Sequence, residues 1–279
     1  MNARSLLLFL TFTMVTGASA QPAAARARIK LESYRKTIAV RARVGSQEGL
    51  FALDTAGGLS LFTPSFAKRA GCKTWGRLTG FQMMGDRFDS PRCDDMKIEI
   101  GGERFSAPIV GVFDIMSLYP KGAEPIDGSL ALDIFAGKAI TIDFPGKLLT
   151  VESEESLRAR VGAKTAVEVP ARIAREVQGH ALAVSVGVKT ADGTVWMELD
   201  SGNGGTILVN KVYARLFGLN SSTEGPQKVS FELAKGLTVE GDAFAPDMVI
   251  DGNIGMPFLK KTVATFDLVS GRVWLAAAK

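Results

Sequence analysis

The sequence predicts a mostly-β protein built from two copies of one lobe around a pseudo-twofold axis. An Asp-containing turn occurs twice, in "FALDTAGGLSLF" (51–62) and "MELDSGNGGTIL" (197–208). A second block is duplicated as well, because "IDGSLALDIFAGKAITIDF" (126–144) aligns with "IDGNIGMPFLKKTVATFDL" (250–268). Apolar and polar residues alternate ahead of each Asp turn, as is typical of half-buried strands.

The elements of each half follow in the same order. An alternating strand, "TIAVRARV" or "HALAVSVGV", leads through a polar turn into the strand that carries the Asp. A short helical pattern comes next, "TPSFAKRAG" or "VNKVYARLFG", and ends in the Gly expected just past a helix C-terminus. Hairpins, an Asp-Gly pair, a strand, a short helix and a final hairpin complete the half. This order leaves little room for helix.

Two further pairs of Asp residues repeat. Asp127 and Asp251 precede Gly at strand entries, and we interpret them as turn residues. Asp143 and Asp267 end strands ahead of turn sequences and receive the same interpretation. The Asp54–Asp127 interval is longer than the Asp200–Asp251 interval, so the first lobe carries an insertion.

The polar segment 152–166 is the expected connector between the halves. We therefore place the N-terminal lobe at 21–160 and the C-terminal lobe at 161–279. Residues 1–20 have the pattern of a signal peptide, with Arg4, an apolar run and the cleavage site "ASA" (18–20). The apolar run is too short to span a bilayer stably. The mature chain is expected to begin at Gln21, without a membrane anchor, and to be periplasmic or secreted.

Export changes the interpretation of the two cysteines, Cys72 and Cys93. In an oxidising compartment, a single pair with none left over predicts a disulfide. Two free buried thiols are the alternative. Because both residues lie inside the longer interval of lobe 1, the bridge is expected to staple the insertion or a flap.

Composition argues against several classes of function. The net charge is +4 with scattered basic residues, and the small cluster at 25–30 favours a solvated segment over a nucleic-acid site. One histidine is too few for a His-based zinc cluster. The loop "GNGGT" (202–206) lacks the remaining residues of both the dinucleotide and P-loop motifs. We expect no nucleic acid, metal or cofactor.

The duplicated turn suggests a specific chemistry. Around a pseudo-twofold axis, Asp54 and Asp200 can meet at the centre of the molecule. Two carboxylates a few Å apart cannot both ionise easily, so they share a proton and their pKa values split. One then serves as a general base toward water, and the other as a general acid toward a carbonyl oxygen.

These residues resemble the aspartic peptidases of the pepsin and retropepsin clan. The resemblance rests on "LDTA" with "SLALDIF" in lobe 1 and on "LDSG" with "NIGMPFL" in lobe 2, and it covers nearly all of the mature chain. It implies a two-lobed acid-protease fold made of tandem retropepsin-like lobes, an internal pseudo-dimer that is a monomer. Asp54 and Asp200 would form the catalytic dyad, and the hydroxyls of Thr55 and Ser201 would lock the turns together. Simple turn capping is the alternative role for these hydroxyls.

Lobe 1 departs from the family pattern at two positions, since Ala56 and Ala131 stand where the family has Gly. If these positions need a positive φ or a close backbone approach, each Ala costs about 1 kcal/mol. Two functions follow. The first is an exported aspartic endopeptidase that binds a peptide or protein substrate in the cleft between its lobes. The alternative is a catalytically silent peptide-binding or scaffold protein on the same fold.

Overall fold

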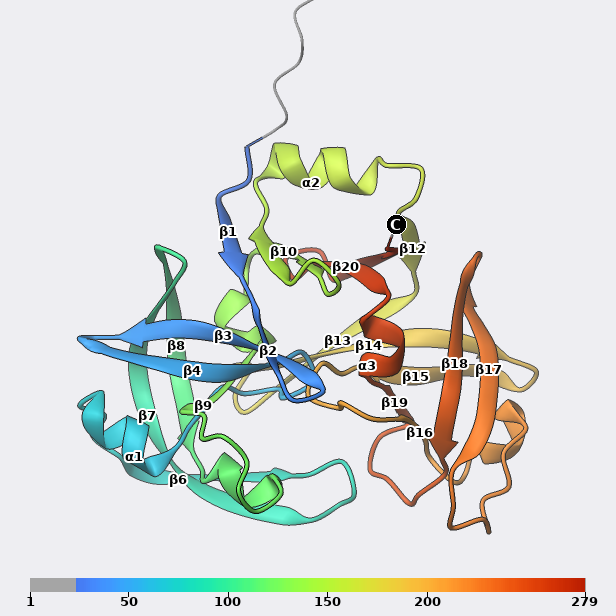
Figure 1. Cartoon of the computed structure of the whole chain (residues 1–279), viewed down its shortest axis with the longest axis horizontal. Helices are drawn as coiled ribbons and strands as arrows, with labels where there is room; N and C mark the ends of the chain where they lie inside the picture. The colour runs from blue at the N-terminus through green and yellow to red at the C-terminus, as the bar shows by residue number, and fades with distance from the viewer. Residues whose placement is uncertain (1–23, 279) are drawn as a thin grey trace, which may run out of the picture.

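The computed structural model describes residues 24–278, so the signal-peptide prediction for residues 1–20 lies outside the described residues. Within the described part of the chain, the strands form three sheets (Figure 1). One sheet of eight strands belongs to lobe 1, one of seven strands belongs to lobe 2, and a sheet of six strands takes three from each half. The predicted mostly-β, two-lobed architecture is confirmed.

The lobe 1 sheet has the order β2-β3-β4-β9-β5-β8-β7-β6. Its strands are β2 (Glu32–Tyr34), β3 (Thr37–Val44), β4 (Gln47–Asp54), β5 (Leu61–Phe62), β6 (Trp75–Phe81), β7 (Arg87–Ile100), β8 (Glu103–Val112) and β9 (Gly128–Ala131). Helix α1 (Pro64–Arg69) and the 3₁₀ helices η1 (Ile115–Leu118) and η2 (Leu132–Phe135) lie between these strands or follow them.

The lobe 2 sheet repeats this plan with the order β13-β14-β15-β19-β16-β18-β17. Its strands are β13 (Ala171–Glu176), β14 (Ala181–Thr190), β15 (Gly193–Leu199), β16 (Ile207–Val209), β17 (Gln227–Ala234), β18 (Leu237–Phe244) and β19 (Gly252–Ile254). The 3₁₀ helix η3 (Ala214–Phe217) and helix α3 (Met256–Leu259) correspond to α1 and η2. The predicted glycines follow α1 and η3, where Gly71 and Gly218 have φ values of 72° and 71°.

The shared sheet joins the two halves. It consists of β1 (Ala27–Lys30), β11 (Leu148–Val151), β10 (Ala139–Asp143), β20 (Thr262–Asp267), β21 (Arg272–Ala277) and β12 (Val167–Val169), in that spatial order. At its centre β10 and β20 pair antiparallel, with Thr141 opposite Thr265. The two hydroxyls are 2.9 Å apart across a sequence separation of 124 residues, the offset that relates Asp127 to Asp251. The pseudo-twofold axis therefore passes between these two threonines.

Helix α2 (Glu154–Val161) lies within the predicted connector, between β11 and β12. The sequence explains where it begins, because the Ser153 and Ser156 side chains form a reciprocal capping box. Acidic residues in its first turn and basic residues in its last turn complement the helix dipole. The lobe boundary between residues 160 and 161 stays a prediction. No helix of the described chain is both long and apolar enough to cross a membrane.

The repeated Asp-Gly pairs hold the Asp-bearing strands in place. β9 lies between β4 and β5, and β19 lies between β15 and β16. A Cβ on Gly128 would lie 2.0 Å from the Leu61 carbonyl oxygen, and a Cβ on Gly252 would lie 2.9 Å from that of Leu208. Only glycine permits so close an approach of two backbones.

The Asp of each pair acts beyond its own turn. Asp127 accepts a hydrogen bond from the Leu50 amide at 3.0 Å, and Asp251 accepts one from the Trp196 amide at 3.1 Å. Our interpretation of them as simple turn residues was therefore incomplete, because each carboxylate also binds the adjacent strand. Asp143 and Asp267 do accept amide hydrogen bonds within their own turns, as predicted.

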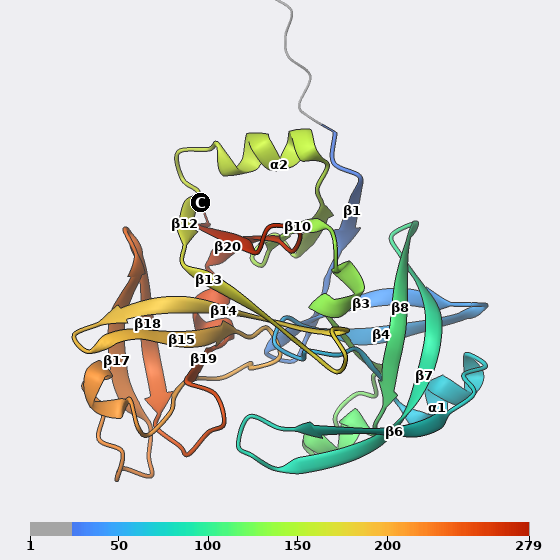
Figure 2. The same cartoon turned by 180° about the vertical axis from the view of Figure 1, so that it is seen from behind.

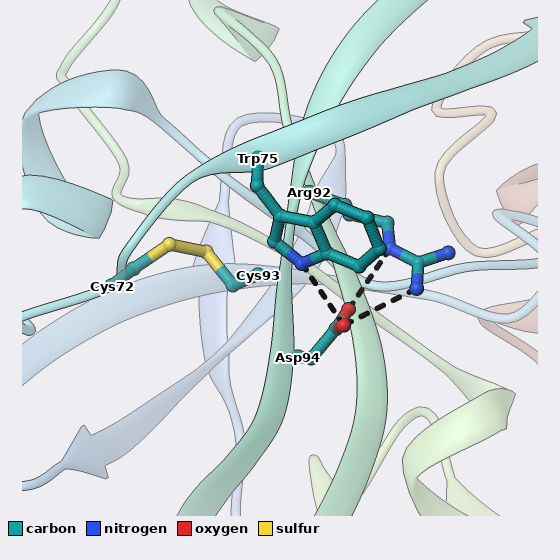
Figure 3. Close-up of a disulfide and its surroundings, with 5 residues drawn as sticks. All are labelled: Cys72, Trp75, Arg92, Cys93 and Asp94. Atoms are coloured by element: carbon teal, nitrogen blue, oxygen red, sulfur yellow. Dashed lines mark hydrogen bonds and ion pairs between the residues drawn. A yellow bond between two sulfur atoms is a disulfide. The ribbon is translucent and has the colours of Figure 1, made fainter.

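The predicted Cys72–Cys93 disulfide is present, and the described residues contain no free cysteine. Cys72 follows α1 and Cys93 lies on β7, so the bridge closes the base of the β6–β7 hairpin, which we call the flap. Figure 3 shows Trp75 beside this bridge, with the Arg92 guanidinium stacked on its ring. Trp75 also donates a hydrogen bond to Asp94 at 3.0 Å. Strand β6 of the flap has no equivalent among the lobe 2 strands, and it accounts for part of the insertion in lobe 1.

This arrangement predicts the effect of removing the bridge. A double variant, Cys72→Ser with Cys93→Ser, should lower the free energy of unfolding by about 3 kcal/mol, because the bridge restricts the unfolded chain. Urea denaturation followed by circular dichroism measures the change. Non-reducing peptide mapping of the wild-type protein serves as the control and should show the two cysteine peptides linked. Two free thiols in that map would contradict the assignment.

Candidate active site

The two Asp turns meet at the lobe interface. Asp54 ends β4 and Asp200 directly follows β15, so each carboxylate lies at the end of a strand buried on one face. A Cβ placed on Gly202 would lie 3.0 Å from Cγ of Asp54 and 3.1 Å from Oδ1 of Asp200. The two side chains therefore flank one point, as the repeat predicted. Asp200 is 3% exposed and Asp54 is half-buried.

Four hydrogen bonds across the interface lock the two turns together. The Thr55 hydroxyl donates to the Leu199 carbonyl at 2.5 Å and accepts from the Ser201 amide at 3.0 Å. The Ser201 hydroxyl donates to the Leu53 carbonyl at 2.5 Å and accepts from the Thr55 amide at 3.0 Å. Both side chains are essentially inaccessible to solvent. Each hydroxyl thus crosses to the other lobe, an arrangement that simple capping of its own turn would not produce.

Asp200 is held by several donors of its own lobe. The amides of Gly202 and Asn203 donate to Oδ1 at 2.7 and 3.1 Å. The Asn253 side chain donates to Oδ2 at 2.7 Å and in turn accepts from the Asn203 side chain at 2.8 Å. Burial raises the pKa of Asp200, while these donors oppose the rise because they favour the ionised form.

Asp54 has a poorer set of donors, since only the Ala56 amide, at 3.1 Å, forms a clear hydrogen bond with it. Burial, followed by the nearby charge of Asp200, raises the pKa of Asp54 to about 7. A hydrogen bond between the two carboxyl groups also raises the pKa of Asp54, and it lowers the pKa of Asp200. Both pKa values are raised, so the pair shares a proton, and the larger number of hydrogen-bond donors around Asp200 favours that group as the carboxylate.

The structure explains how Ala131 fits at the position where lobe 2 has Gly255. At the equivalent position in lobe 2, a Cβ on Gly255 would lie 2.5 Å from the Asn203 carbonyl oxygen, which accepts the Met256 amide. In lobe 1 the Asn203 equivalent is Gly57, and its carbonyl accepts the Leu59 amide within the turn instead. Ala131 has an ordinary φ of −101° and incurs no left-handed strain.

A buried pair replaces the missing contact in lobe 1. The Ser60 hydroxyl accepts a hydrogen bond from the Ala131 amide at 2.9 Å and donates to Asp133 at 2.6 Å. The Ser60 amide donates to the same carboxylate at 3.0 Å. Burial raises the pKa of Asp133 to about 6, although both Ser60 donors oppose the shift. Ala56, which stands where lobe 2 has Gly202, also has no positive φ. Unlike Ala131, it lies within the Asp turn itself.

Sequence reasoning missed three residues of this region: Asn253, Asp133 and Glu198. Asn253 was detectable in principle, because it directly follows the second repeated Asp-Gly pair. Asp133 has Pro257 as its counterpart in lobe 2, so the repeat gave no indication of it. Glu198 lies two residues before Asp200 on β15, where lobe 1 has Ala52 before Asp54.

The flap reaches from lobe 1 to lobe 2. Its turn at residues 82–86 extends toward the loop that precedes β19 (Figure 2). The Val249 amide of that loop donates to the Met83 carbonyl at 3.0 Å. Phe81, Met84 and Val249 are all largely exposed around this contact. The flap turn is therefore joined to lobe 2 by a backbone hydrogen bond.

Other kinds of site find little support among residues 24–278. No group of three or more His, Cys, Asp and Glu side chains in this range is arranged to hold a metal ion. A hollow of about 590 Å³ between α2 and the shared sheet is lined by Trp274 and Arg160 among others, and it does not contact the dyad. The two carboxyl groups are thus the best candidate for a reactive centre.

Comparisons with known proteins agree with this fold. The chain has the mostly-β, two-lobed architecture of the pepsin-like proteins. Among solved structures it is similar to the crystal structure of basic 7S globulin from soybean, with a TM-score of 0.55 and 9% sequence identity. The match covers 90% of this chain and 94% of the globulin chain. At this identity the likeness shows the fold alone. No protein-family model and no curated protein sequence matches the chain.

The lock gives a prediction about stability. Thr55→Val keeps the shape of the side chain but leaves the Leu199 carbonyl and the Ser201 amide without their partner. We expect the free energy of unfolding to fall by about 1–3 kcal/mol, the usual penalty for unsatisfied buried polar groups, measured by urea denaturation. Thr55→Ser retains the hydroxyl and is the matched control. Equal stability of the Val and Ser variants would show that the cross-lobe hydrogen bonds contribute little.

Proposed function

We propose that this protein is an exported aspartic endopeptidase that hydrolyses peptide bonds with water activated by the Asp54–Asp200 dyad. The observation that carries the proposal is the unequal pair of carboxyl groups at the lobe interface. Asp200 accepts three hydrogen bonds from lobe 2 donors, and Asp54 has a pKa raised to about 7. One group is thus suited to remain ionised and the other to retain a proton.

The unequal pair assigns the roles of the reaction. Ionised Asp200 accepts a proton from the attacking water, and protonated Asp54 donates its proton to the oxygen of the scissile carbonyl. When the C–N bond of the resulting tetrahedral intermediate breaks, Asp200 donates its newly acquired proton to the leaving amine, and Asp54 takes a proton from a hydroxyl of the intermediate, which restores the starting pair. No metal or cofactor takes part. Because Asp54 must hold a proton, activity should decline as the pH rises through about 7.

The substrate is a peptide or protein segment bound in extended form between the lobes, under the flap. Extended peptides form strand-like hydrogen bonds with exposed backbone, and in this proposal the flap supplies such backbone. We propose that the mature protein acts as a monomer, because the duplication supplies both carboxylates in one chain. The disulfide fits an oxidising compartment, and we propose that the protein is periplasmic or secreted.

A binding protein without catalytic activity is the second candidate, and Ala56 is the observation that favours it. A Cβ placed on Gly202 would lie about as close to Asp54 as to Asp200, so little free space exists beside the two carboxyl groups. The Ala56 methyl group takes the corresponding place in lobe 1. If it excludes the attacking water, the protein binds peptides and cleaves none, and Ala56→Gly should restore cleavage.

Removal of either carboxylate tests the dyad. Asp54→Asn and Asp200→Asn should each abolish hydrolysis of a mixed peptide library between pH 3 and 8, as followed by mass spectrometry. The double variant should be hardly worse than either single variant, because groups that act as a unit are not additive. Circular dichroism checks that each variant folds. Cleavage by either single variant at close to the wild-type rate would refute the mechanism.

Asn253 provides a test of the assigned roles. Its side chain lowers the pKa of Asp200, so Asn253→Ser, which installs the residue that lobe 1 has at this position, should raise that pKa. The acid limb of the pH profile of kcat/KM reports ionisation of the general base and should move to higher pH. An unchanged acid limb, or one at lower pH, would assign the base role elsewhere. Ser230→Ala, on the distant strand β17, is the control.

A further inference from the structure

Glu198 is a third carboxylate close to the dyad. Successive side chains of a strand point to opposite faces, so Glu198, two residues before Asp200, lies on the face of β15 opposite to Met197 and Leu199, which point into the core. Glu198 is half-buried, and its register neighbours are Ser185 on β14 and Asn253 on β19. At about 3.3 Å per residue, its Cα lies only about 7 Å from that of Asp200.

Lobe 1 treats the same position differently. Ala52, the counterpart of Glu198, is buried in an apolar cluster with Tyr34, Ile115 and Ile126. Two of these residues come from the loop at 113–127 that contains η1. The corresponding loop of lobe 2, at 245–251, is roughly half as long and contains no helix. Glu198 is therefore partly accessible where lobe 1 is filled with apolar side chains.

Glu198 has no cationic partner within the part of the chain that the structure describes. Arg172 of β13 lies in the same row of the sheet, but its guanidinium stacks on the Trp196 ring with 3.8 Å to the centroid. The charged groups that act on Glu198 are Asp200, Asp54 and Glu176, all acidic. Burial, followed by these charges, raises the pKa of Glu198 to about 8. A half-buried carboxylate in such surroundings favours the arrival of a cation.

We propose that Glu198 is a specificity-determining residue, which binds the cationic side chain of a lysine or arginine on the substrate residue that lies against lobe 2 beside the scissile bond. This inference rests on the proposed function. The Cα separation from Asp200 corresponds to one or two residues of an extended peptide, so the selected residue lies that close to the cleaved bond. Ion pairing keeps Glu198 ionised, and the preference for a cation strengthens as the pH rises toward 8.

Matched peptides test the proposal. A series places arginine at each of the four positions on either side of a scissile bond, and a second series carries citrulline, which has a similar shape but no charge. At one position, wild-type kcat/KM should favour arginine by tenfold or more, and this ratio should increase between pH 5 and 8. Glu198→Gln and Glu198→Ala should bring the ratio close to one, and Glu198→Asp should retain part of it. Glu224→Gln removes a charge from an exposed turn of the same lobe and should keep the wild-type ratio.

Two outcomes would overturn the inference. One is a wild-type ratio close to one at every position. The other is a Glu198→Gln variant whose pH profile moves equally for both peptides while the ratio is unchanged, since Glu198 would then act on the dyad and not on the substrate.

A binding measurement separates this inference from the proposed function. Fluorescence anisotropy with Asp54→Asn protein compares its affinity for the arginine and citrulline peptides, with Glu198 intact or replaced by Gln. Arginine selectivity in binding that depends on Glu198, together with no cleavage by the wild-type protein, supports the inference and overturns the peptidase proposal. Cleavage without arginine selectivity overturns the inference and leaves the peptidase proposal in place.

Discussion

The structure depends on the hydrogen bonds that Thr55 and Ser201 form across the lobe interface. Each hydroxyl donates to a backbone carbonyl of the other lobe and accepts from a backbone amide there. These hydrogen bonds fix the backbone of the two turns. The carboxyl groups of Asp54 and Asp200 therefore cannot move apart to relieve their repulsion. Sharing a proton is then the lower-energy solution, and burial reinforces it. The closeness of the two carboxyl groups thus depends on two hydroxyls that are themselves inaccessible to solvent.

The two lobes share these hydrogen-bonded Asp turns and differ in the residues around them. Asn253 supports Asp200, whereas Ser129 at the matching position does not bond to Asp54. Lobe 1 carries the flap and the longer loop, and lobe 2 carries the additional carboxylate. A symmetric pair of carboxyl groups would have no preferred location for its proton. The differences between the lobes supply that preference, and they also give the two sides of the interface different chemical character.

Much of the fold followed from the repeat, because strand alternation, Asp-Gly pairs and terminal glycines are local signals. The Asp turns were also predictable, since both halves carry them at matching positions, whereas the cross-lobe role of the hydroxyls followed from the resemblance to the pepsin and retropepsin clan. Asn253, Asp133 and Glu198 were not predicted, because each acts through partners brought near by sheet register or by turn geometry. Ala131 illustrates the same limit. From the sequence, an alanine at this position was expected to lower stability. In the structure Gly57 and Ser60 make room for Ala131 and bind it, and their positions in the sequence do not indicate this.

The central pairing of β10 with β20 also bears on how the halves are joined. Backbone hydrogen bonds of the shared sheet, the Thr141–Thr265 contact and the locked turns all link the halves directly. The covalent link runs through α2 and the exposed residues 162–165 at the periphery. The halves are therefore held together by contacts that do not involve the polypeptide crossover. A single proteolytic nick there is expected to yield two fragments that remain associated.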